Sequence, residues 1–291
     1  MITTEFKQRI VEGIKERRPH YESNAKMAVA LGINSAQLSR IVKGELDGVL
    51  SDANWISIAR RLDIKLNRGL EWVTAETELY KFVYAQLKAC QERSLSALLC
   101  DVTDIGKSYT AKCYAKENRY VVYIDCSQVK TKQKLIRAIA KELGLGHAGK
   151  YADVYADLVF YLQTTPSPLI IIDEAGDLEY PAFLELKALW NATEYACGWY
   201  MMGADGLKAK IEKNKGNNVV GYAEIFSRYG SRYQKVSPDG KEAAQQFTMK
   251  QFAVIVKANV PGIAGSEIQK MYAKTGGSLR RIRIEIEKLR A

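Results

Sequence analysis

The sequence predicts an α/β fold: a doubly wound parallel sheet with a small helical lid, preceded by an all-helical domain. Short apolar runs alternate with amphipathic helical patterns between residues 94 and 203, as strands and helices do in such a sheet. Residues 1–66 carry apolar residues at helical spacing, and residues 276–290 return to that spacing. With 47% hydrophobic residues, the chain of 291 residues can bury the cores of two domains.

The charge is distributed unevenly along the chain. There are 43 Lys+Arg against 33 Asp+Glu, a formal net charge of +10. Residues 1–70 hold 12 basic and 8 acidic residues, residues 71–205 hold 14 and 18, and residues 206–291 hold 17 and 7. Basic ends are typical of a protein that binds a polyanion, because Lys and Arg release counterions from phosphates. A solvated basic surface explains the same charge equally well.

Several classes of protein are disfavoured. No stretch approaches the roughly 18 continuous apolar residues of a membrane helix, and Met1 to Pro19 is charged where a signal peptide is apolar. The five cysteines are scattered without a CxxC pair, which predicts neither a disulfide framework nor a zinc site. Neither His20 nor His147 lies in a motif that could partner a nucleophile. We therefore expect a cytoplasmic protein with no membrane contact.

Residues 24–44 have the pattern of two helices joined by a tight turn. The first helix has a short apolar face made by Met27, Ala28 and Leu31. Gly32 is expected to end it, because glycine adopts a positive φ cheaply. Ser35 is expected to cap the second helix, whose inward residues would be Leu38, Ile41 and Val42.

The outer face of the second helix is polar and basic. Residues of these types in a recognition helix reach base edges and phosphates, and here they are Ser35, Ala36, Gln37, Ser39, Arg40 and Lys43. A later amphipathic stretch from Asp52 to Leu62 would complete the small core with Trp55, Ile58, Ala59 and Leu62. Residues 5–66 thus resemble the repressor-like helix-turn-helix family, which implies binding to double-stranded DNA. An ordinary helical hairpin is the alternative.

A phosphate-binding loop is indicated after the apolar run of residues 94–100. The sequence Asp101-Val-Thr-Asp-Ile-Gly-Lys-Ser108 follows that run and leads into a helix from Tyr109 to Asn118. Such a loop needs backbone N–H groups at a helix N-terminus, a lysine for the β and γ oxygens and a hydroxyl for Mg²⁺. Gly106, Lys107 and Ser108 end the loop and supply these elements. Ile105 and Tyr109 flank them in the expected ATP site.

The loop departs from the usual pattern at two positions. Asp101 and Asp104 stand where glycines are usual. Aspartate tolerates a left-handed backbone better than most residues, but a carboxylate close to a triphosphate costs electrostatic energy. We expect weakened nucleotide binding or rotation of both carboxylates away from the phosphates.

A second motif supports the first. Residues 168–174, Pro-Leu-Ile-Ile-Ile-Asp-Glu, form a buried strand pattern that ends in two acids. Asp173 is expected to hold Mg²⁺ through water, and Glu174 is expected to act as general base on the attacking water. Further strands are expected at residues 120–126, 198–203 and about 232–236, with helices near 131–143, 151–163 and 181–195. These elements predict a parallel sheet with its ligand at the strand C-termini.

The two motifs and their spacing resemble those of the AAA+ ATPases. The resemblance implies ATP and Mg²⁺ as cofactors and an oligomer in which an arginine finger reaches a neighbour's γ-phosphate, with Arg228 as first choice and Arg232 as second. It also implies a sensor-2 arginine, Arg280 or Arg281, at the start of a lid helix that Ser278 would cap. The buried stripe of that helix would be Leu279, Ile282, Ile286 and Leu289. The sensor-1 position has only Asp205 near it, without the customary Asn or Thr.

A helix-turn-helix followed by a compact ATPase with a short lid is similar to the transposition ATPases of the phage Mu B type, and the ATPase part also resembles the IstB and TnsC groups. This resemblance implies ATP-dependent assembly as an oligomer or helical filament on nonspecific duplex DNA, target selection and activation of a transposase. The lysines of a cluster after the fourth strand would line a pore or groove for DNA: Lys208, Lys210, Lys213 and Lys215.

Two alternatives remain open. A helicase loader of the same ATPase core would serve replication, and a helix-turn-helix regulator could carry a degenerate phosphate loop that no longer hydrolyses ATP. On the preferred hypothesis the parts are residues 1–66 for DNA binding, 67–77 as linker, 78–238 as ATPase and 239–291 as lid.

Overall fold

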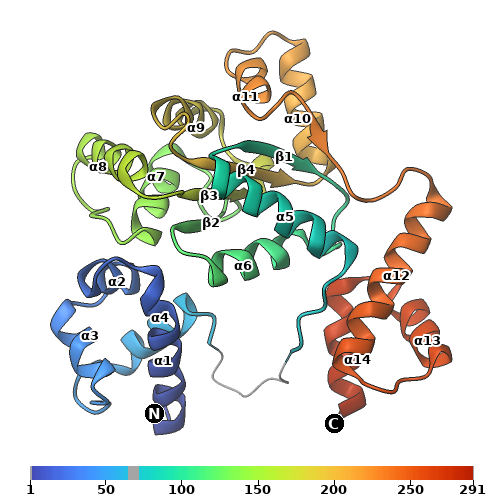
Figure 1. Cartoon of the computed structure of the whole chain (residues 1–291), viewed down its shortest axis with the longest axis horizontal. Helices are drawn as coiled ribbons and strands as arrows, with labels where there is room; N and C mark the ends of the chain where they lie inside the picture. The colour runs from blue at the N-terminus through green and yellow to red at the C-terminus, as the bar shows by residue number, and fades with distance from the viewer. Residues whose placement is uncertain (1, 65–71, 291) are drawn as a thin grey trace.

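The computed structural model describes residues 2–64 and 72–290. Its centre is a parallel sheet, with a helical N-terminal body before it and a helical C-terminal body after it (Figure 1). Residues 67–71 of the expected linker lie outside the described residues, and the expected domain bounds stay a prediction. In the described part of the chain, no helix is both long enough and apolar enough to cross a membrane.

The sheet has the strand order β2-β3-β4-β1-β5, with every pairing parallel. This confirms the expected doubly wound α/β fold. The expected strands are all present, although the last is only two residues long: β1 (Ser96–Cys100), β2 (Val121–Asp125), β3 (Leu169–Asp173), β4 (Gly198–Gly203) and β5 (Tyr233–Gln234).

Helices cover both faces of the sheet because its strands are apolar on both sides. One face carries α7 (Lys132–Glu142), α8 (Tyr151–Thr164) and α9 (Tyr180–Ala192), with α10 (Asp205–Gly216) and α11 (Tyr222–Arg228) beyond them. The other face carries α5 (Glu78–Arg93) and α6 (Lys107–Glu117). Each of the three helices expected between residues 131 and 195 is confirmed to within a few residues.

The strand register aligns the C-terminal ends of the central strands. Cys100 pairs with Gly203, Ile172 with Met201, and Asp125 with Asp173. Because parallel strands end at a common edge, the segments that follow β1 and β3 emerge at the same edge of the sheet, with β4 between them. The two sequence motifs are therefore neighbours in space.

The N-terminal body contains α1 (Thr4–Arg17), the 3₁₀ turn Arg18–His20, α2 (Asn24–Leu31), α3 (Ser35–Val42) and α4 (Asp52–Arg61). The turn between α2 and α3 follows the prediction, with Gly32 at φ 72° and its N–H donating to Ala28 and Val29 carbonyls. The expected apolar residues of α4 are buried, Trp55 and Ile58 completely.

Two expectations for α3 are wrong. Asn34 and not Ser35 caps the helix, since the Asn34 side chain accepts the Gln37 N–H while the Gln37 side chain accepts the Asn34 N–H. Val42 does not point inward but is 38% exposed, because one residue past Ile41 the helix has turned away from the core.

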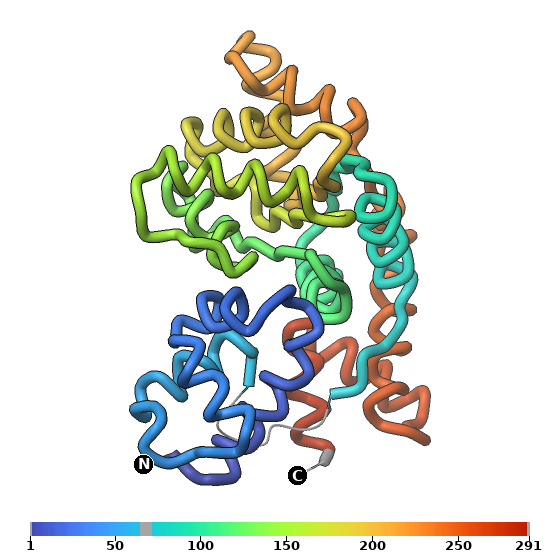
Figure 2. The backbone as a smooth tube through the Cα atoms, turned by 60° about the vertical axis from the view of Figure 1, so that its left-hand side comes forward, coloured from blue at the N-terminus to red at the C-terminus, as the bar shows by residue number. Residues whose placement is uncertain are grey.

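The N-terminal body packs on the sheet body through its first half. His20 Nδ1 lies 3.0 Å from the Asn118 carbonyl, and Lys26 Nζ lies 4.1 Å from the centre of the Tyr161 ring. Helix α2 contacts α7, whereas α3 lies further from the sheet (Figures 1 and 2).

The C-terminal body consists of α12 (Lys241–Asn259), α13 (Gly265–Thr275) and α14 (Leu279–Arg290) around a small apolar core. Ser278 caps α14 as expected, with its Oγ accepting the Arg281 N–H at 3.3 Å. Ile282 and Ile286 are buried and Leu279 is partly buried, but Leu289 is 53% exposed, so the expected stripe stops one turn early. The Asn259 side chain bonds both backbone groups of Val73 at 2.9 Å and so joins α12 to the segment before α5.

Candidate nucleotide-binding site

The segment between β1 and α6 has the geometry of a phosphate-binding loop. Asp104 and Gly106 take positive φ values of 60° and 101°, and α6 begins immediately afterwards at Lys107. The first N–H groups of a helix have no partner within the helix and carry its positive dipole end, so they form a site for an anion. The predicted order of strand, loop and helix is confirmed.

Lys107 points into the loop that precedes it. Its Nζ donates to the Asp101 carbonyl at 2.7 Å and the Val102 carbonyl at 2.6 Å, and the residue is buried. Burial lowers the pKa of Lys107, while the nearby carboxylates of Asp101, Asp173 and Glu174 oppose that shift. An ammonium group held only by neutral carbonyls can be drawn to a phosphate without breaking an ion pair.

Asp101 turns its carboxylate away from the loop interior and into the protein. Its oxygens accept the N–H groups of Val236 at 2.7 Å and Ser237 at 2.9 Å, the Ser237 hydroxyl, and the Val102 N–H at 2.8 Å. The residue is completely buried. Asp101 therefore fixes the segment after β5 to the start of the loop.

Asp104 directs its carboxylate to the N-terminus of α14. It accepts the Ser278 hydroxyl at 2.5 Å and the Arg280 N–H at 3.0 Å, and the Arg280 Nε lies 3.8 Å away. Both loop aspartates are thus bonded to the chain beyond β5.

The acids after β3 lie on the other side of the loop. Asp173 is buried and accepts the Tyr123 hydroxyl at 2.5 Å and the Glu174 N–H at 2.8 Å. Glu174 is exposed and has φ 49°. Burial, followed by the charge of Asp173, raises the pKa of Glu174, whereas Lys107 lowers it.

The donor set beside the loop suits Mg²⁺. The ion prefers hard oxygen ligands, and the Ser108 hydroxyl and Asp173 carboxylate supply them close to a phosphate site. Tyr123 holds the second of them, because its hydroxyl donates to the Asp173 carboxylate. Ser108 and Asp173 would hold the ion, which would neutralise phosphate charge.

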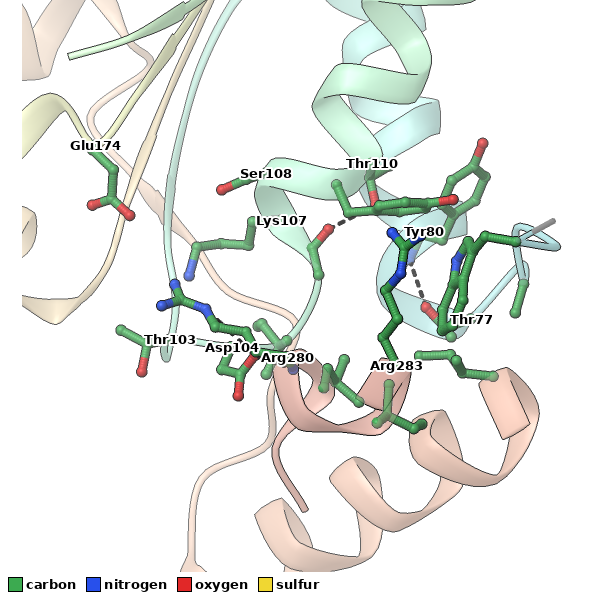
Figure 3. A pocket seen from close by; sticks show the side chains of 18 residues that line it. Thr77, Tyr80, Thr103, Asp104, Lys107, Ser108, Thr110, Glu174, Arg280 and Arg283 are labelled. Carbon is green, nitrogen blue, oxygen red and sulfur yellow. Dashed lines mark hydrogen bonds and ion pairs between the residues drawn. The ribbon is translucent and has the colours of Figure 1, made fainter. Parts of the chain in front are cut away.

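A cavity of about 320 Å³ opens from the loop toward the C-terminal body (Figure 3). This volume falls within the range of roughly 300–1,000 Å³ that is usual for small-molecule pockets. Its loop end is lined by the predicted residues Asp104 to Tyr109 and Glu174, and also by Thr103 and Thr110, which were not predicted. Its other end is largely apolar and aromatic and is lined by Trp72, Ala75, Thr77, Tyr80, Ile255, Leu279 and Ile282.

Two arginines of α14 reach this cavity. Figure 3 shows Arg280 beside Asp104 and Arg283 pointing toward Tyr80 and Thr77. The Arg283 guanidinium lies 5.7 Å from the centre of the Trp72 ring. Arg281, the other predicted sensor residue, is exposed and its guanidinium bonds the Thr275 carbonyl at 3.4 Å instead.

Sequence reasoning missed the aromatic end of the cavity. Trp72 lies in the stretch interpreted as a linker, and Tyr80 lies in the first turn of α5, a helix that was not predicted. The spacing of Arg280 and Arg283, three residues apart on one helical face, was a usable signal. Tyr123 was interpreted only as part of an apolar strand.

The candidate finger arginines lie outside the lining of this cavity. Arg228 is half-buried, donates to Asn191 Oδ1 at 2.6 Å and packs over the Trp190 ring at 5.4 Å. Arg232 is exposed. Asp205, near the expected sensor-1 position, begins α10 and does not line the cavity either.

The lysine cluster of α10 has mixed environments. Lys210 donates to the carbonyls of Gly176 at 2.8 Å and Leu178 at 2.6 Å, so it supports the turn after Glu174. Lys215 pairs with Glu212, whereas Lys208 and Lys213 are exposed.

The predicted DNA-facing residues of α3 also differ in exposure. Ser35, Ala36, Arg40 and Lys43 are exposed, while Gln37 and Ser39 are partly covered. The Gln37 amide donates to the Val49 carbonyl at 3.3 Å in addition to its capping bond, which gives it a structural task.

Comparison with known proteins shows what the chain is similar to. A model of an AAA domain matches residues 90–211, the span that contains both motifs. The DNA transposition protein B of the Mu-like prophage FluMu of Haemophilus influenzae is 23% identical over 266 residues, which cover 89% of this chain and 88% of that protein. The chain thus contains an AAA domain and is similar to the Mu transposition protein B type over most of its length.

Two shorter matches are to proteins of the same kind. The ATP-dependent target DNA activators B of Escherichia phage Mu and Escherichia phage D108 are each 26% identical over 161 residues. These matches cover 54% of this chain and 49% of each activator, so they leave about half of those proteins uncompared.

Proposed function

We propose that this chain binds ATP with Mg²⁺ in the cavity between the phosphate loop and α14 and uses it to control assembly on double-stranded DNA during transposition. The observation that carries the proposal is the meeting of Lys107, Ser108 and Glu174 at one end of a cavity whose other end is aromatic. A nucleotide has the same two-part chemistry, a polyanion joined to a flat base.

The parts of the site have distinct tasks in this proposal. The N-terminal N–H groups of α6 and the Lys107 ammonium bind the phosphates, and Ser108 and Asp173 hold Mg²⁺. Glu174 accepts a proton from the attacking water, for which its raised pKa is suited. Arg280 contacts the terminal phosphate from the lid side.

The base is proposed to lie against the aromatic end of the cavity. Trp72 and Tyr80 offer flat apolar surfaces there. The Arg283 guanidinium, 5.7 Å from the Trp72 ring centre, closes the same end from α14. Stacking of this kind stabilises a bound base without any change in the phosphate contacts.

The DNA part of the proposal rests on the basic ends of the chain and on its relatives. The helix α3 presents Arg40 and Lys43 on its exposed side, and the exposed Lys208 and Lys213 lie on α10. One relative is named a DNA transposition protein and two are named target DNA activators. We propose that copies of the chain assemble on duplex DNA with ATP, with Arg228 or Arg232 contacting a neighbour's nucleotide, and that the assembly activates a transposase.

Nucleotide binding is the first test. Lys107→Ala should weaken the binding of a fluorescent ATP analogue by at least tenfold, because a hydrogen bond to a charged group contributes about 1.5–3 kcal/mol. Lys116→Ala, in the last turn of the same helix and exposed, is the matched control and should bind as the unaltered chain does. Equal binding by both variants would remove the phosphate-loop assignment.

A further inference from the structure

Tyr123 occupies an unusual place between the two motifs. It lies on β2, opposite Ile171 of β3, and its side chain is on the same face of the sheet as Asp173, two residues further along. Its hydroxyl donates to Asp173 Oδ2 at 2.5 Å.

The hydrogen bond from Tyr123 completes the fixing of the Asp173 carboxylate. The other carboxylate oxygen accepts the Glu174 N–H at 2.8 Å. With one bond to each oxygen, the plane of the carboxylate cannot rotate without losing a hydrogen bond. The Asp173 backbone is held as well, since its carbonyl accepts the Cys126 N–H at 2.9 Å.

The Tyr123 ring is itself held in position. It packs against the buried apolar cluster under α5 and α6, and Lys112 Nζ of α6 lies 5.2 Å from the ring centre.

We propose that Tyr123 is a positioning residue of the Mg²⁺ site, an inference that rests on the proposed function. Mg²⁺ demands nearly octahedral geometry, so a carboxylate that is already oriented binds it, or its water ligands, at lower cost. Residues that hydrogen-bond a metal ligand typically change metal affinity by about 10–100-fold when removed. Tyr123 joins β2 to a site whose expected ligands come from α6 and β3.

The test measures how much Mg²⁺ the full-length chain needs. Tyr123→Phe keeps the ring and removes the hydroxyl, and binding of a fluorescent ATP analogue is titrated with Mg²⁺ at fixed nucleotide. The Mg²⁺ concentration for half-maximal response should rise about tenfold. Binding in EDTA should not change, which separates a metal effect from loss of the nucleotide site.

Tyr151→Phe is the matched control. The Tyr151 hydroxyl donates to Glu185 Oε1 at 2.6 Å between α8 and α9, so this variant also removes a tyrosine–carboxylate bond, but away from the cavity. It should show the Mg²⁺ requirement of the unaltered chain. Thermal unfolding of both variants establishes that they are folded.

The outcomes separate the two proposals. An unchanged Mg²⁺ requirement in Tyr123→Phe, with Mg²⁺-dependent binding intact in the unaltered chain, would overturn the role of Tyr123 alone. Binding by the unaltered chain that is the same with Mg²⁺ and EDTA would overturn the metal site and this role together. Absence of nucleotide binding by the unaltered chain would overturn the proposed function itself.

Discussion

Ser278 Oγ donates a hydrogen bond of 2.5 Å to Asp104 Oδ2, and this bond joins the phosphate loop to the first residue before α14 across 174 positions of sequence. The Arg280 N–H, at 3.0 Å, reinforces it. The position of the lid helix is therefore set directly by a loop residue, at a place where a glycine could offer no such bond.

Two substitutions of Asp104 should separate the effect of its charge on ATP binding from the effect of its hydrogen bonds. Asp104→Asn keeps an acceptor for α14 and tolerates φ 60°, but it removes a negative charge near the expected phosphates. We expect ATP to bind at least about threefold more tightly, because like charges a few ångströms apart repel by more than 1 kcal/mol at an effective dielectric constant of about 20. Isothermal titration measures the change.

Asp104→Gly completes that comparison. Glycine also tolerates the positive φ but offers no acceptor to Ser278 or Arg280. Asp104→Gly should bind ATP less tightly than Asp104→Asn, because α14 is no longer held to the loop. Weaker binding by Asp104→Asn than by the unaltered chain would mean that the charge of Asp104 favours the nucleotide.

Asp101 should matter for stability more than for binding. Asp101→Ala leaves two N–H groups and the Ser237 hydroxyl without their buried acceptor. Each such loss costs about 1–3 kcal/mol, so the midpoint of thermal unfolding should fall by at least about 5–10 °C. Tryptophan fluorescence follows it, with exposed Asp157→Ala of α8 as control. Equal midpoints for both variants would show that these bonds contribute nothing to stability.

Glu174→Gln should keep ATP bound and stop its hydrolysis. The amide retains the shape of the side chain but cannot accept the proton of water. Phosphate release should fall by about 100-fold or more, with nucleotide affinity within about twofold of the unaltered chain. Retained hydrolysis would assign the base to another residue.

The pH dependence of hydrolysis follows from the same residue. Burial and the charge of Asp173 raise the pKa of Glu174, so the carboxylate becomes protonated at a higher pH than an ordinary glutamate. Only the unprotonated form acts as base, and the rate should therefore fall as pH decreases through that raised value. A rate that stays level down to the ordinary glutamate range would contradict the assignment.

The two finger candidates can be separated by assembly size. Arg228→Ala should retain nucleotide binding but lose ATP-dependent oligomers, because an arginine finger acts on a neighbour's site. The Arg228 side chain also bonds Asn191 and packs over Trp190. Thermal unfolding of Arg228→Ala must therefore be measured as well, to establish that the variant is folded. If light scattering shows ATP-dependent oligomers of the usual size for Arg228→Ala and smaller ones for Arg232→Ala, Arg232 is the arginine finger.

Local signals predicted much of the fold. The segment that forms β3 is apolar at every position before Asp173, and all five of its residues are buried. The loop before Lys107 and the turn at Gly32 were recognisable because a few adjacent residues define them. Strands, helices and motifs within short windows therefore followed from sequence.

Errors arose where two neighbouring residues could perform the same task. Asn34 and Ser35 are both good caps, and only the bond to Gln37 distinguishes them. Leu289 continues the apolar spacing of α14, but it is 53% exposed and does not belong to the apolar core of the C-terminal body. Spacing predicts which face a residue occupies and not how far the neighbouring element extends.

The partners of the site residues could not be predicted. The bonds from Asp101 to Ser237, from Asp104 to Ser278 and from Tyr123 to Asp173 join residues 50 to 174 positions apart. Such contacts depend on how distant parts of the chain pack together, which a short stretch of sequence does not determine. The two carboxylates of the loop are evident in the sequence, but their directions are known only from the structure.

ATP-dependent assembly on DNA tests the central claim most directly. Particle size is measured by light scattering with the unaltered chain, nonspecific duplex DNA and ATP, ADP or no nucleotide at one salt concentration, and again with Glu174→Gln. The proposed function predicts large assemblies with ATP alone, and persistent ones with Glu174→Gln. Small, stoichiometric complexes that are the same in all three nucleotide states would contradict it and would favour a helix-turn-helix regulator on an inactive ATPase scaffold.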